Sequence, residues 1–370
     1  MARIASMVLA SALALAAGAN GLPRVEKVDD FTLIDQQGVA HRLSYYSDAP
    51  AIVLFVQGNG CPIVRNVLPD LKAVRDKFEP AGVRFLMLNA NLQDTRKAIR
   101  KETQDWNIDF DVLHDEAQLV ATSLEVERTA EVFVIRPDSM EIAYRGAVND
   151  RLTYERQKKQ ASEHYLADAL KATLAGKPVE TPYVAPRGCL VNLEPEAGVA
   201  SYPETIAPML KEKCAECHRP EGIGPWAMTS HAMIKGFAPM IREVVRTKRM
   251  PPWHADPAVG HWQNDVGLTA SDAKTLVRWI EAGAPRGSGP DPLESVAPSD
   301  GGWPLGKPDL VVDIPAFDIP ASGVVDYQFP AVANPLDRDV WVRAITILPG
   351  ATEVVHHVLV GTGKSATSGE

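Results

Sequence analysis

The chain lacks a long hydrophobic run after its first twenty residues, although 45% of its 370 residues are hydrophobic. A membrane-spanning helix needs about 20 consecutive apolar residues, so we expect no span in the remainder. Basic residues are not in excess either: 47 Asp and Glu outnumber 38 Lys and Arg, and the formal net charge is −9. This balance argues against a nucleic-acid partner, which requires a basic patch. We find no internal repeat, and only four cysteines.

The first twenty residues have a different composition. Arg3 is their only charge, residues 4–17 are apolar or small, and residues 17–19 read Ala-Gly-Ala. A short apolar run that ends in an A-x-A site predicts a secretory signal peptide over residues 1–19. The alternative is an uncleaved anchor, for which the run is short and rich in small residues. We therefore expect a periplasmic or secreted protein with no membrane span after cleavage.

Two stretches rich in Pro, Gly, Ser and acidic residues lack clear periodicity and predict linkers at residues 178–200 and 287–304. They separate blocks at residues 24–177, 201–286 and 305–370, and the chain is long enough for two or three domains. We expect a multidomain protein: an α/β domain, an all-α domain, and a partial all-β, sandwich-like segment.

The first block alternates buried strands with helices. The apolar pattern predicts strands at residues 51–56, 83–89, 131–135 and 144–147, and helices at residues 62–78 and 94–106. The last two strands pair across a turn at Pro137-Asp138. This order, with residues 31–35 at its start and Cys61 after the first central strand, resembles the thioredoxin-like redoxin family over about residues 25–150.

Cys61 is the candidate nucleophile of this block. It precedes a predicted helix, whose N-terminal N–H groups and dipole stabilise a thiolate, and Arg65 one turn later adds positive charge. The chain departs from the family at three places. Val64 replaces the resolving cysteine of thioredoxins, Gly58 replaces the Thr or Ser of peroxiredoxins, and residues 129–131 lack the expected cis-proline. An inert thiol and a non-catalytic binding module are therefore the alternatives.

Cys189 is the candidate resolving thiol. It lies in the first predicted linker and is the only other cysteine outside a pentapeptide considered next. Two thiols in an oxidising compartment pair where geometry allows. Three outcomes stay open for Cys61 and Cys189: a catalytic pair, a static disulfide, or no bond.

The pentapeptide Cys214-Ala215-Glu216-Cys217-His218 has the C-x-x-C-H spacing of a c-type haem attachment site. Cys214 and Cys217 bind the porphyrin through thioether bonds, and His218 becomes an axial ligand of the iron. A structural zinc site is the alternative. It needs four ligands, and the histidines downstream lack the paired spacing of common zinc modules. Chance occurrence is the remaining explanation.

Met250 is the candidate second axial ligand, because two prolines follow it and hold its segment extended. His254 is the alternative ligand, and an ordinary core methionine is the alternative role. Residues 276–285 predict a final amphipathic helix that Gly and Pro terminate. Residues 201–286 therefore resemble a small class I-like cytochrome c domain. The resemblance implies haem c and electron transfer to redox partner proteins.

The last block alternates apolar and polar residues and predicts antiparallel strands at residues 324–329 and 340–345. The adjacent pair His356 and His357 resembles the copper-binding strand of the copper type II, ascorbate-dependent monooxygenases, and implies copper. Neighbouring strand residues face opposite ways, so one ion binds both only at a bulge. The alternative is two ordinary sheet histidines. The family's third histidine and second copper domain are missing from this sequence, which resembles a truncated member.

The order of the three blocks resembles a set of large exported bacterial redox proteins. It implies an exported c-type haem protein that transfers electrons and is coupled to the thioredoxin-like domain. The alternative is an oxidoreductase proper, which acts as a thiol or antioxidant enzyme through Cys61 or as a copper monooxygenase. The sequence does not identify the thiol or small-molecule substrate.

Overall fold

The computed structural model describes residues 25–152, 157–195, 198–298, 306–351, 354–355 and 358–361. The chain divides into two compact units, of which the first ends at Pro195. Across the described residues every helix is too short or too polar to cross a membrane. The predicted signal peptide and the His356–His357 pair lie outside the described residues.

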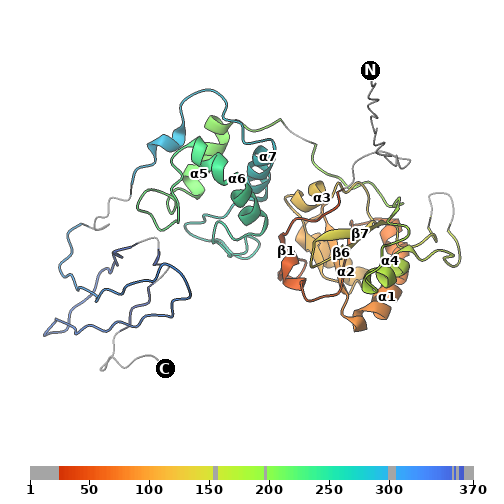
Figure 1. The fold of residues 1–370 in the computed structure, drawn as a ribbon, viewed down its shortest axis with the longest axis horizontal. Coiled ribbons are helices and arrows are strands. Elements are labelled where there is room, and N and C mark those ends of the chain that lie inside the picture. The colour runs from red at the N-terminus through yellow and green to blue at the C-terminus, as the bar shows by residue number, and fades with distance from the viewer. Residues whose placement is uncertain are drawn as a thin grey trace, which may run out of the picture. The chain divides into compact units, whose positions relative to one another are not determined.

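The first unit is built on one mixed sheet, in which the described strands follow the order β2-β1-β5-β4-β3-β6-β7-β8 (Figure 1). The central strand β3 pairs in parallel with β4 and antiparallel with β6. The bounds are β1 Thr32–Asp35, β2 Ala40–Arg42, β3 Ile52–Gln57, β4 Arg84–Asn89, β5 Val112–His114, β6 Val132–Arg136, β7 Glu141–Gly146 and β8 Tyr183–Val184.

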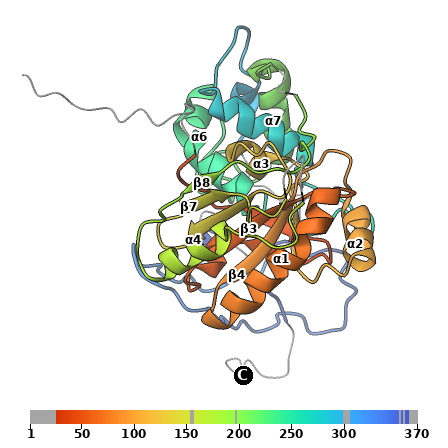
Figure 2. The same cartoon turned by 90° about the vertical axis from the view of Figure 1, so that its right-hand side faces the viewer.

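Helices cover both faces of this sheet, so β3 carries apolar side chains on both of its faces. Val53 and Phe55 face a core shared with helices α1, α2 and α4, whereas Ile52 and Leu54 face a core shared with α3. Figure 2 looks onto α1 and α4, which lie on the same face. The bounds are α1 Pro62–Phe78, α2 Arg96–Asp105, α3 Leu119–Ser123 and α4 Tyr165–Leu174, with short 3₁₀ turns at Leu43–Tyr46 (η1) and Glu79–Ala81 (η2).

The predicted elements of this unit are confirmed where the apolar period was strong. The helix predicted at residues 62–78 is α1, and the strands predicted at 51–56, 83–89 and 131–135 are β3, β4 and β6 to within a residue or two. The antiparallel pairing of the last strand with β6 is also confirmed. Strand β5, helix α3 and strand β8 are five residues or shorter and were not predicted.

The predicted linker at residues 178–200 is ordered in part. It contributes β8, which pairs in parallel with β7, and an extended segment that forms a β-bridge through Leu190 to Arg128. A two-residue edge strand has too few positions to show a period in sequence. The first unit therefore extends beyond the α/β block predicted from sequence.

The second unit contains three described α-helices: α5 Ala207–Lys213, α6 His231–Arg246 and α7 Ala270–Glu281. A π-helical turn at Tyr202–Ile206 (η3) leads into α5, and a 3₁₀ turn (η4) follows α7 at Pro292–Ser295. The predicted final helix is confirmed as α7. It begins earlier than predicted because Thr269 and Asp272 form a capping box. Its Trp279 is fully buried and stacks on Tyr202.

The strands predicted at residues 324–329 and 340–345 are not formed: residues 306–351 contain no strand. Their alternating apolar side chains are exposed, among them Val324 and Trp341. Alternation supplies one apolar face, but a strand is stable only when that face is covered and its backbone groups are paired. Neither condition is met among these residues, and the predicted all-β character of this segment is corrected.

Candidate active site

Cys61 lies where β3 gives way to α1. It is the N-cap residue of α1, and Pro62 takes the first helical position, where a missing N–H costs nothing. Its side chain is 4% exposed. The predicted placement at a helix N-terminus is confirmed, and the N–H of Val64 in the first turn donates to the sulfur.

The structure brings Cys189 to Cys61. Their Sγ atoms are 2.7 Å apart although 128 positions separate them in the chain, and both thiols are free. The geometry thus places side by side the two thiols for which the sequence left open a catalytic pair, a static disulfide or no bond. The contact is close enough for sulfur exchange between the two side chains.

Residues 188–193, which we term the Cys189 segment, hold the second thiol in place by pairing with the chain before β6. The N–H of Thr129 donates to the carbonyl of Cys189 at 2.9 Å, and the N–H of Val191 donates to the carbonyl of Glu127 at 2.9 Å. The N–H of Cys189 donates to Thr129 Oγ1 at 2.9 Å. The segment thus runs antiparallel to residues 127–129 and forms an isolated β-bridge with them.

The pKa values of the two thiols are shifted in opposite directions. Burial raises the pKa of the Cys61 thiol, but four hydrogen bonds outweigh burial. They come from the Cys189 thiol, the Thr129 hydroxyl and the backbone N–H groups of Val64 and Cys189, and they hold the pKa of Cys61 below its usual value. Burial and the neighbouring Cys61 sulfur raise the pKa of Cys189 to about 11. Cys61 is therefore the more acidic thiol of the pair, and Cys189 the less acidic one.

Arg65 does not take the part predicted for it. Its guanidinium lies over the Trp106 ring, 5.5 Å from the ring centroid, and its side chain is exposed. The groups that lower the pKa of Cys61 are hydrogen-bond donors, as above. Long side chains at a helix surface take the partner nearest their own tip, which one-turn spacing does not reveal.

Two carboxylates fix the turn that carries Cys61, and sequence reasoning missed both. Glu102 on α2 accepts the N–H of Gly60 at 2.6 Å and the Gln57 amide at 3.0 Å. Asp94 accepts the N–H of Asn59 at 2.9 Å. The turn between β3 and α1 is therefore held at Gln57, Asn59 and Gly60, which sets the direction in which Cys61 leaves the strand.

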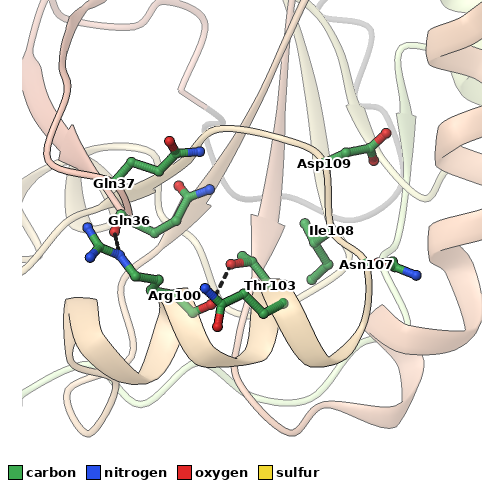
Figure 3. Close-up of a pocket in the computed structure, with 8 residues that line it drawn as sticks. Gln36, Gln37, Arg100, Thr103, Asn107, Ile108 and Asp109 are labelled. Atoms are coloured by element: carbon green, nitrogen blue, oxygen red, sulfur yellow. Dashed lines mark hydrogen bonds between the residues drawn. The ribbon is translucent and has the colours of Figure 1, made fainter.

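A pocket lies elsewhere in this unit, between α2 and the turn after β1 (Figure 3). Its lining includes Gln36, Arg100 and Thr103, but neither Cys61 nor Cys189. Arg100 donates to the carbonyl of Gln36 at 2.7 Å, and Thr103 donates to the carbonyl of Arg100. These groups satisfy one another, and the pocket is separate from the thiol pair.

A buried histidine and two aspartates gather near the same sheet edge. Ligand atoms of Asp35, His41 and Asp111 lie within 4.8 Å of one another. Both ring nitrogens of His41 already have partners, Asp35 at 2.9 Å and Tyr46 at 2.5 Å. Asp35 also accepts three backbone N–H groups of the β1–β2 turn, including that of Gly38. The cluster closes a turn, and its histidine has no free lone pair for a metal.

The pentapeptide from Cys214 to His218 follows α5 directly. Nδ1 of His218 lies 2.9 Å from the carbonyl oxygen of Trp226, so Nδ1 carries the proton and Nε2 keeps its lone pair. The ring packs against Gly224, where a Cβ would lie 2.7 Å from Nδ1. Cys217 is exposed, and burial is the main cause that raises the pKa of Cys214. The arrangement fits a haem ligand.

The other histidines described in this unit are His231, His254 and His261, and they do not gather into a zinc site. Nε2 of His231 meets the carbonyl of Ala284 at 2.8 Å, and its ring packs edge-on against Tyr202. His254 and His261 are exposed.

Met250, the predicted second axial ligand, is 39% exposed. Its N–H donates to the carbonyl of Val244, so its segment folds back onto the end of α6.

Comparison with known families agrees with the fold of the first unit. Residues 25–150 match the model of the AhpC/TSA family. This part of the chain is a redoxin domain of the thioredoxin-like kind, as predicted, and it supports a thiol redox function. The match ends at residue 150 and thus includes Cys61 but not Cys189. No curated protein matches the chain.

Among solved structures, a hypothetical protein from Sinorhizobium meliloti is 23% identical over 48% of this chain and 98% of its own, with a TM-score of 0.43. An uncharacterized conserved protein from Geobacillus kaustophilus is 26% identical over 48% and 96%, with a TM-score of 0.42. The peroxidoxin BcpB from Mycobacterium tuberculosis is 19% identical over 40% and 92%, with a TM-score of 0.30.

Proposed function

We propose that the first unit is a two-cysteine thiol–disulfide oxidoreductase, in which Cys61 attacks and Cys189 resolves. The observation that carries the proposal is the 2.7 Å contact between two sulfurs of opposite acidity. A thiolate beside a protonated thiol is the arrangement that an exchange reaction requires, because one sulfur attacks first and the other attacks only after the first is bonded.

The chemistry balances as two successive displacements. The Cys61 thiolate attacks one sulfur of a substrate disulfide, forms a mixed disulfide, and releases the other sulfur as a thiolate that takes up a proton. Cys189 then loses its proton and attacks the Cys61 sulfur, which releases the second substrate thiol. Two electrons pass from the cysteine pair to the substrate, and an external dithiol returns the Cys61–Cys189 disulfide to two thiols.

Peroxide is the alternative oxidant, and it would convert the Cys61 thiolate to a sulfenic acid that condenses with the Cys189 thiol and releases water. A cation near the sulfur would stabilise the charge that develops on the leaving oxygen. The predicted cation, Arg65, lies over the Trp106 ring. We take a disulfide as the proposed substrate and peroxide as the alternative for the assay to decide.

A turnover assay tests the proposal. Reduced full-length protein is mixed with a glutathionylated peptide or with hydrogen peroxide at equal concentration, and an excess dithiol regenerates it. We expect dithiol-dependent reduction of the peptide to be faster than that of peroxide. Cys61→Ser should abolish both reactions. Wild-type protein no faster than Cys61→Ser on either oxidant would refute the assignment.

We also propose that residues 201–286 hold a c-type haem, with thioether bonds to Cys214 and Cys217 and with His218 and Met250 as axial ligands. The Nδ1 contact of His218 with the Trp226 carbonyl supports this, since it orients the ring and leaves Nε2 free. When bound, haem supplies one-electron transfer. The leader at residues 1–19 supports export to the compartment where such attachment takes place.

Protein made in a periplasm with haem-maturation machinery tests this second proposal. It should carry one haem that stays attached after denaturation, and Cys214→Ala/Cys217→Ala should carry none. A colourless wild-type product that contains zinc would overturn it. Copper binding at His356 and His357 stays a prediction, which metal analysis of His356→Ala checks.

A further inference from the structure

Peroxiredoxins carry a Thr or Ser hydroxyl three residues before the reactive cysteine. In this chain that position, 58, is glycine, so Cys61 has no such hydroxyl. The structure shows why no side chain fits there. A Cβ on Gly58 would lie 2.7 Å from Thr129 Cγ2 and 2.5 Å from Asn91 Nδ2. The side chain of Thr129, in the loop before β6, fills the space beside the sulfur on this side.

The hydrogen bonds of Thr129 determine which acceptor receives its hydroxyl proton. Its Oγ1 accepts the N–H of Cys189 at 2.9 Å, which uses one lone pair. The hydroxyl then has two acceptors within reach, the Cys61 sulfur at 3.1 Å and the Cys189 carbonyl at 3.5 Å. The carbonyl is farther away and already accepts the N–H of Thr129 at 2.9 Å. A thiolate has no proton to give, so the hydroxyl donates to it.

Thr129 is only 1% exposed, so water does not replace this donor. In a buried site, a hydrogen bond to a charged acceptor is stronger than one between neutral groups. We propose that the Thr129 hydroxyl is a donor that stabilises the Cys61 thiolate, in the place that a side chain at position 58 holds in peroxiredoxins. The proposal rests on Cys61 as the nucleophile of the proposed function.

The test compares Thr129→Val with Thr129→Ser in the full-length reduced protein. Valine keeps the methyl group beside Gly58 and removes the hydroxyl, whereas serine keeps the hydroxyl and removes the methyl group. Iodoacetamide is the probe, and the rate of modification at the Cys61 peptide is followed by mass spectrometry from pH 5 to 10. Circular dichroism establishes that each variant is folded.

We expect Thr129→Val to raise the pH midpoint of Cys61 alkylation by about one unit, which is roughly a tenfold loss of thiolate well below the midpoint. Thr129→Ser should stay near wild type. Thr103→Val is the matched control, since it removes another buried hydroxyl of the same unit, one that donates to the Arg100 carbonyl. It should leave the midpoint unchanged. Thr129→Ala replaces the valine variant if that variant does not fold.

Two results would overturn the proposal. One is a wild-type midpoint in Thr129→Val, and the other is a serine variant as impaired as the valine variant, which would assign the effect to packing. Both results are read on reduced protein, so neither requires the Cys61–Cys189 disulfide to form. If wild-type Cys61 and Cys189 never form a disulfide, the proposed function fails, while the alkylation midpoint still reports on Thr129.

Discussion

Gly188 approaches Thr129 so closely that a Cβ at position 188 would lie 1.7 Å from the Thr129 carbonyl oxygen. The contact is between two backbones, so no side-chain movement relieves it. Glycine at this position is therefore what allows the Cys189 segment to pair with the chain before β6 and to bring its thiol to Cys61.

Substitution Gly188→Ala should displace the Cys189 segment and slow closure of the Cys61–Cys189 disulfide by about tenfold or more, as expected for loss of oriented proximity. Quenched-flow alkylation after addition of oxidised glutathione measures the closure rate. Gly198→Ala is the control, because a Cβ there meets no atom within 4 Å. Equal closure rates in the two variants would show that the contact is not needed.

The acidities of the two thiols predict an order of modification. The pKa of Cys61 is lowered and that of Cys189 is raised to about 11, so Cys61 loses its proton before Cys189 as the pH rises. A limiting amount of iodoacetamide at pH 8 should label Cys61 first, with a midpoint below the roughly 8.5 of a free thiol. Preferential labelling of Cys189 would reverse the assignment of roles.

Glu102 joins α2 to the turn before Cys61 through its bond to the N–H of Gly60. Glu102→Gln replaces one acceptor oxygen by an NH₂ group and removes an exposed hydrogen bond, which should cost about 0.5–1.5 kcal/mol of unfolding free energy. Urea denaturation measures this cost. Asp105→Asn on the same helix is the control. Its exposed pair with Lys101 contributes about 0.5 kcal/mol or less.

In the haem-loaded protein, Met250→Ala should open the iron to added imidazole or cyanide and remove the weak near-infrared band of a thioether ligand. A spectrum that does not change would assign the second axial position to another residue, with His254 as the first candidate. Wild-type protein titrated with the same ligands under the same conditions provides the comparison.

The sequence predicted the part of the site that local pattern controls. Cys61 before Pro62, followed by the apolar period of residues 62–78, defined the start of α1, and β3 was evident as a buried run. The position of Cys189 was not predictable, because its segment has no period and docks through a backbone approach at Gly188. In the sequence, Thr129 stood out only because residues 129–131 lack the expected cis-proline. Its contact with Cys61 was not predictable, because 68 positions separate the two residues.

The errors have the same cause. The spacing of Arg65 from Cys61 is correct for a helical turn, but Trp106, distant in sequence, holds the guanidinium. The strands expected at residues 324–329 and 340–345 have the right alternation, yet nothing described covers their apolar faces. The local sequence pattern indicates which secondary structure or contact a segment favours. Whether that structure or contact forms depends on residues distant in the chain.

The central claim is that Cys61 attacks first and Cys189 resolves. Reduced wild-type protein and Cys189→Ser are treated with oxidised glutathione, quenched in acid, and mapped by peptide mass spectrometry without reduction. The account predicts a Cys61–Cys189 disulfide in the wild type and a stable glutathione adduct on Cys61 in Cys189→Ser. Adducts on Cys189 with Cys61 unmodified, or a wild-type protein in which both cysteines stay reduced, would contradict it.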